Sequence, residues 1–117
     1  MIVLEINEPS PSLNRAQGSH WSRRHKLRKR WGWLVKAALN SAGYWERPKW
    51  SRAKVTVERY GARLLDDENL RAGFKPALDA LVKEGILLDD NPNVIGSPEF
   101  RQFTGKDRKT IVRIQPA

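Results

Sequence analysis

Apolar and polar positions alternate at the start of the chain. Ile2, Leu4 and Ile6 are separated by Val3 and Glu5, and this period of two predicts a short strand with one well-buried face. The stretch 7–20 contains prolines, serines, asparagines and a glycine, a composition that favours a loop. A strand followed by a long loop is therefore the expected beginning of the fold.

The next segment has a helical period. Between residues 22 and 42 the apolar positions recur at spacings of three and four, which predicts an amphipathic helix, and Gly43 follows as a stop signal. The apolar stripe consists of Leu27, Trp31, Leu34, Val35, Ala38, Leu39 and Ala42. Because Trp31 lies on this stripe, we expect it in the core.

A second strand and a second helix follow. Residues 53–60 alternate again, which predicts a strand, and apolar residues recur at helical spacing from Asp67 to Gly85. Pro76 lies inside this second helix and has no N–H to donate. We expect either a kink near Gly73 or a helix that restarts with Pro76 at its first position.

The last third of the chain predicts two more strands. Residues 94–100 suggest an irregular strand, residues 110–114 a regular one, and residues 104–109 a hairpin loop between them. The order is then strand, helix, strand, helix, strand, strand. We expect an α/β (α+β) fold: one domain over 1–117, with a single mixed sheet of about four strands and two main helices packed on it.

Composition narrows the class of protein. The 117 residues include no cysteine, 39% are hydrophobic and 30% charged, which is typical of a globular domain without disulfides or Cys-ligated zinc. The beginning of the chain does not resemble a signal peptide, and no stretch approaches the ~20 apolar residues of a membrane span. A cytoplasmic location is expected. The formal net charge of +9 favours a polyanionic partner, nucleic acid above all.

The acids are concentrated in one region. Seven of the 13 Asp and Glu residues fall between Asp66 and Asp90, and five of them form two clusters, residues 66–68 and 89–90, at opposite ends of the second helix. If the chain returns along the helix after Gly85, the two clusters can meet, and such carboxylates favour Mg²⁺ or Mn²⁺. The alternative is structural: the first cluster suits a helix N-terminus, and residues 89–92 have the composition of a turn.

The segment "LDDENLRAGFKPALDALVKEGILLDDNPNV" resembles the RusA family of Holliday junction resolvases, small endonucleases common in phages and prophages. In that family an acidic motif ending in Asn-Leu opens a helix, a lysine follows on it, then Asp-Ala-Leu, and an Asp-Asp pair comes after a turn. The matching positions are Asp66, Glu68, Asn69 and Leu70, then Lys75, then Asp79, Ala80 and Leu81, then Asp89 and Asp90. The loop "PSPSLNR" and the basic aromatic helix are also similar to the family.

The resemblance implies roles for individual residues. The metal-binding and catalytic carboxylates fall on Asp66, Glu68 and Asp90, with Asp67 and Asp89 as reserve ligands, and the catalytic lysine falls on Lys75. It further implies a homodimer that uses Mg²⁺ to cut four-way DNA junctions in recombination and repair. This sequence departs from the pattern twice: Glu68 stands where the family has Asp, and about three extra residues precede Lys75.

Basic residues before and within the first helix are the expected DNA contacts. The structural alternative is that these charged side chains form a solvated helix face. In the resolvase interpretation they contact phosphates and fix the position of the protein on the DNA without reading its sequence. Two other functions stay open: a RusA-like protein that binds branched DNA without cutting it, and a basic RNA-binding module. The expected contacts are Asn14, Arg15, Arg23, Arg24, Lys26, Arg28, Lys29 and Arg30.

Overall fold

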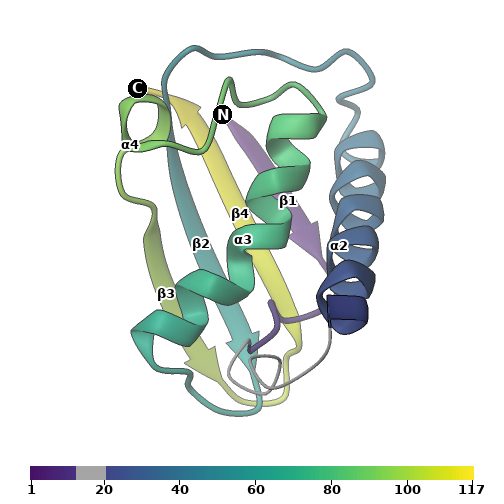
Figure 1. Ribbon diagram of the computed structural model, residues 1–117, viewed down its shortest axis with the longest axis vertical. Helices are drawn as coiled ribbons and strands as arrows, with labels where there is room; N and C mark the ends of the chain where they lie inside the picture. Colours follow the sequence, from purple (N-terminus) through teal and green to yellow (C-terminus); the bar gives the residue numbers. More distant parts are fainter. Residues whose placement is uncertain (13–20) are drawn as a thin grey trace.

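The computed structural model describes residues 1–12 and 21–117, and for residues 21–23 it describes the backbone alone. The element order confirms the expected fold, a single mixed four-stranded sheet with two main helices (Figure 1). The elements are β1 (Ile2–Ile6), α2 (Trp21–Ser41), β2 (Ala53–Gly61), α3 (Asp67–Lys83), α4 (Pro92–Ile95), β3 (Glu99–Thr104) and β4 (Lys109–Pro116).

The strand order in the sheet is β1-β4-β2-β3. β4 lies antiparallel between β1 and β2, whereas β3 pairs in parallel with β2 at the edge. Across this sheet Leu4 lies opposite Val112, which lies opposite Val57, which lies opposite Phe100. The expected hairpin between the last two strands is wrong, because β2 separates them: β4 gains two partners in the sheet centre, where its alternating apolar residues are buried.

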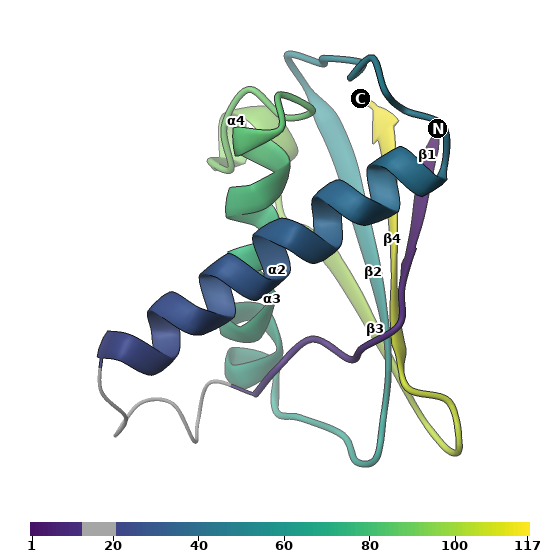
Figure 2. The same cartoon turned by 90° about the vertical axis from the view of Figure 1, so that its right-hand side faces the viewer.

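Both main helices cover the same side of the sheet, and α2 crosses α3 (Figure 2). Trp31, 2% exposed, is in the core as its stripe position predicted. Phe74 of α3 is fully buried and makes an edge-to-face contact with Phe100 of β3, with ring centroids 5.7 Å apart. Burial of these apolar faces is what holds the helices on the sheet. No helix in the described part of the chain is long and apolar enough to cross a membrane.

Two local expectations differ from the structure. α3 is one helix with Pro76 inside it, so the alternative of a restart at Pro76 is wrong, and a kink is left as a prediction. Val94 and Ile95 belong to the short helix α4 instead of an irregular strand. The side chain of Asn91 accepts hydrogen bonds from the N–H groups of residues 93 and 94, and this cap explains why a helical turn forms there.

The segment after β1 lies against α3. The carbonyl oxygen of Pro11 approaches Gly73 so closely that a Cβ at Gly73 would overlap it. Arg59 of β2, only 8% exposed, donates from Nε to the carbonyl oxygen of Ser10 at 2.7 Å. The N–H of Ser10 donates to Thr110 Oγ1 at 2.9 Å. These contacts fix the N-terminal segment beside the first half of α3.

Candidate functional site

The acidic motif begins with a helix cap. Asp66 is the N-cap of α3; its Oδ1 accepts from the N–H of Asn69 at 2.9 Å and its Oδ2 accepts from Asn69 Nδ2 at 2.7 Å. The backbone hydrogen bond and then the side-chain one lower the pKa of Asp66 below its ordinary value, because both stabilise the carboxylate. Asp66 therefore caps the helix, as the structural alternative for the first acidic cluster predicted, and its carboxylate is the hydrogen-bond partner of Asn69.

The next two acids point in different directions. Asp67 accepts from Arg71 Nε at 2.9 Å, a pair one helical turn apart on the exposed surface. Glu68 is exposed and lines a hollow of about 310 Å³ between α2 and α3. Among the described residues Glu68 forms no ion pair, so its carboxylate is available to a ligand.

The second acidic cluster reaches the middle of α3. After Gly85, which has a φ of +84°, the chain turns back and Asp90 forms an ion pair with Lys75. Lys75 Nζ also lies 3.3 Å from Asp79 Oδ1. Asp89 accepts from the N–H of Asp90 at 2.7 Å, and this bond orients the turn that carries Asp90. The structure therefore brings together the lysine and one carboxylate that the family resemblance singles out.

Asp66 lies away from this pair. It precedes Lys75 by nine residues, or about 13.5 Å of helix at 1.5 Å per residue, and the contact of Lys75 with Asp79 directs the ammonium group farther from Asp66. No group of three or more His, Asp and Glu side chains in the described ranges is arranged to hold a metal ion. The present arrangement does not fit one Mg²⁺ bound jointly by Asp66, Glu68 and Asp90, and the assignment of these ligands stays a prediction.

The hollow beside Glu68 joins the basic helix to the acidic motif. Arg24 and Arg28 line it from α2, and Glu68, Lys75 and Asp79 line it from α3. Three of these five side chains are cationic and two are acidic, and they share a space of about 310 Å³. An anionic group could approach the two arginines and Lys75, while Glu68 lines the same space.

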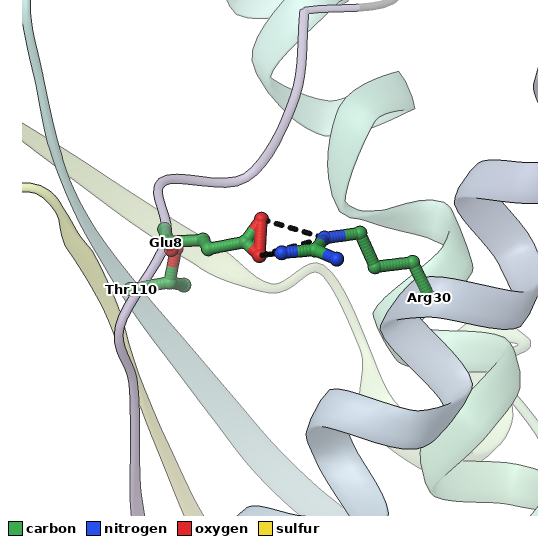
Figure 3. A network of polar contacts seen from close by, with 3 residues as sticks. All are labelled: Glu8, Arg30 and Thr110. Atoms are coloured by element: carbon green, nitrogen blue, oxygen red, sulfur yellow. Dashed lines mark hydrogen bonds and ion pairs between the residues drawn. The ribbon is translucent and has the colours of Figure 1, made fainter.

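The expected DNA-contact residues have different environments. Arg24, Lys26, Arg28 and Lys29 are exposed on α2. Arg30 is also exposed, yet it donates from Nε to both carboxylate oxygens of Glu8, at 2.9 and 2.7 Å (Figure 3). Part of its charge is therefore neutralised within the chain. Asn14, Arg15 and the side chain of Arg23 lie outside what the structure describes.

The sequence did not predict the roles that two residues, Asp79 and Arg59, have at the site. Asp79, a member of the matched Asp-Ala-Leu motif, is the second carboxylate partner of Lys75. Arg59 holds the segment next to α3, and its burial lowers its pKa below the ordinary value. The signal for Arg59 was present, because it continues the buried parity of Ala53, Val55 and Val57 along β2.

No protein-family model matches the chain, and no curated protein matches its sequence.

Proposed function

We propose that this protein is a RusA-like, Mg²⁺-dependent endodeoxyribonuclease that cuts four-way DNA junctions. The observation that carries the proposal is the ion pair between Lys75 and Asp90. These two residues are fifteen positions apart in sequence, and the resemblance assigns a catalytic role to both. Their contact across the turn at Gly85 supports a shared site.

The electrostatics of the neighbouring helix support a phosphodiester substrate. Arg24 and Arg28 line the same hollow as Lys75 and Glu68, and Lys26 and Lys29 are exposed on α2 as well. Arginine and lysine neutralise phosphates and release counterions, so this helix would bring a DNA backbone to carboxylates that would otherwise repel it. In this role the basic side chains position the DNA without reading its sequence.

Lys75 has a defined place in the proposed site. Its side chain is half-exposed, and its ammonium group forms an ion pair with Asp90, whose side chain is 21% exposed. A fixed cation at this position can also contact a phosphate oxygen as negative charge develops on it. For Asp66, Glu68 and Asp90 to bind one ion, Asp90 would have to leave Lys75 and close a gap on the order of 10 Å along the helix.

The same gap favours a second candidate function, binding of branched DNA without cleavage. Glu68 carries one methylene more than the Asp of the family pattern, and the extra turn before Lys75 separates Asp66 from Asp90. A protein with this arrangement would keep its basic DNA-binding surface and lack a complete metal site.

Incubation of the purified protein with a synthetic four-way junction and Mg²⁺ separates the two functions. The nuclease proposal predicts paired nicks near the junction centre, lost in Asp90→Asn while junction binding by gel shift is retained. Tight binding with no cut strand would leave the binding function alone. A hairpin RNA that displaces the junction at equal concentration would instead favour the RNA-binding module. The expected homodimer is checked by light scattering, which would contradict it with a monomer mass.

A further inference from the structure

A second hollow lies between α2 and α3, toward the C-terminal end of α3. It has a volume of about 450 Å³ and is lined from α2 by Lys29, Gly32, Trp33 and Lys36, and from α3 by Lys83. Arg28, Pro76 and Asp79 line both hollows. The two hollows therefore adjoin each other, and together they are named here the α2–α3 groove, with Lys75 lining the first of them.

The charge of this part of the groove is positive and uncompensated. Its two acids are already paired within the chain, Asp79 with Lys75 at 3.3 Å and Glu84 with Arg47 at 2.9 Å. The four cations that line it form no ion pair among the described side chains, although every Asp and Glu of the chain is described. These cations are Arg28, Lys29, Lys36 and Lys83. The groove thus complements a chain of negative charges.

An aromatic ring is exposed at the same place. Trp33 is 67% exposed, which is unusual for the largest apolar side chain. Lys29 precedes it by four residues and Lys36 follows it by three, so all three lie along one face of α2. A flat ring between two lysines provides a surface on which a base can stack while the neighbouring phosphates meet the cations.

Gly32 lines the groove without a side chain. It lies inside the helix α2, where glycine costs stability relative to alanine. Among the described residues, a Cβ at Gly32 would have no heavy atom within 4 Å outside its own helix, so the packing that the structure describes does not require glycine there. The absence of a side chain leaves the backbone of Gly32 accessible to a molecule bound in the groove.

We infer that this part of the α2–α3 groove binds an unpaired DNA strand, with one base stacked on Trp33 and phosphates on Lys29, Lys36 and Lys83. This inference rests on the proposed function, because the groove leads to Lys75 and would hold a strand that opens at a branch point. Charge complementarity and the exposed ring specify the occupant: a duplex has no unstacked base to offer to Trp33.

Binding of a fluorescent oligothymidylate of about ten nucleotides, measured by anisotropy, tests the inference. Trp33→Ala should weaken binding between about 5- and 100-fold, since stacking on an aromatic ring contributes on that scale. Trp45→Ala is the matched control, because Trp45 is 73% exposed and does not line the groove. Lys36→Gln should reduce the slope of log K against log salt by about 0.7.

Gly32→Ala provides a variant whose loss of binding cannot be ascribed to unfolding. It should raise Tm by roughly 4 °C, as alanine favours the helix, and still weaken oligothymidylate binding several-fold. Equal affinities for Trp33→Ala and Trp45→Ala would overturn the inference, as would a Gly32→Ala variant that binds like the parent. An oligouridylate that binds more tightly than oligothymidylate would overturn the assignment to DNA.

The outcomes also separate this inference from the nuclease proposal. If the parent protein cuts no junction but Trp33→Ala loses oligothymidylate binding, the groove is supported and the nuclease activity is not. If the junction is cut and Trp33→Ala binds oligothymidylate like the parent, the nuclease activity stands and the groove inference fails.

Discussion

The ammonium group of Lys75 in the third turn of α3 forms an ion pair with the carboxylate of Asp90, which follows the turn after that helix. This contact connects the two halves of the acidic region, and Asp79 completes it on the other side of Lys75 at 3.3 Å. A lysine between two carboxylates holds all three side chains in place beside the basic helix. The predictions below test the roles of this site and of the packing that supports it.

Lys75→Ala should reduce junction cleavage by about 100-fold or more, because it removes a cation that can stabilise charge developing on a phosphate. The ion pairs of Lys75 are exposed, so the free energy of unfolding should change by less than ~1 kcal/mol. Cleavage rates at saturating junction and urea denaturation measure the two effects. Lys54→Ala, which removes another exposed ion pair, is the control and should cut like the parent. Parental cleavage by Lys75→Ala would exclude the lysine from the site.

Substitutions at Glu68 test whether its carboxylate takes part in the reaction. Glu68→Gln keeps the size of the side chain and removes the charge, and cleavage should fall by about 100-fold. Glu68→Asp restores the residue of the family pattern, and its activity should equal or exceed that of the parent. Rates are measured on one junction over a series of Mg²⁺ concentrations. A Glu68→Gln variant with unchanged rate at every concentration would assign Glu68 to the solvated surface.

Asp66 should make the stability of the protein depend on pH in the acid range. Since hydrogen bonds from Asn69 hold its folded pKa below the ordinary value, its charged form stabilises the native state above that ordinary pKa. The contribution should be lost as the pH falls through the folded pKa. Asp66→Ala should therefore lower Tm at pH 7, with a difference from the parent that shrinks as the pH falls below the ordinary Asp pKa of about 4.

Asp66→Asn is the control for this titration. Its amide oxygen can still accept the backbone hydrogen bond from Asn69 as a helix cap, but it carries no charge. We expect the Tm of Asp66→Asn at pH 7 to lie between the Tm values of the parent and of Asp66→Ala. Because residue 66 no longer titrates in this variant, its Tm should not fall with protonation of that side chain. Parallel Tm curves for the parent and Asp66→Ala throughout the acid range would contradict the prediction.

Gly73→Ala should destabilise the fold, because the added Cβ would overlap the carbonyl oxygen of Pro11. Displacing this backbone segment from α3 should lower the free energy of unfolding by about 2 kcal/mol. Gly32 lies in the other long helix, where an added Cβ would contact no described residue outside the helix, so Gly32→Ala is the matched control. It should raise the free energy of unfolding by about 1 kcal/mol. Denaturant unfolding of both variants measures the difference. Equal effects at the two positions would argue against the contact between Pro11 and α3.

The elements of this fold could be predicted from the sequence because each is fixed by local periodicity. The alternation at Ile2, Leu4 and Ile6 and the helical stripe around Trp31 place residues on one face whatever the rest of the chain does. The start of α3 could be predicted in the same way, because Asp66 is of a residue type that is favoured at a helix N-cap. These signals lie within a few residues of one another.

Pairing partners were decided by the tertiary structure. The four residues between β3 and β4 suggested a hairpin, yet β4 lies between β1 and β2, because burial across the whole sheet outweighs the proximity of two strands in sequence. The distance between Asp66 and Asp90 also depends on the path of the chain after Gly85. Local pattern specifies which carboxylates are present, whereas packing of the returning chain against α3 determines that Asp90 contacts Lys75 and not the residues around Asp66.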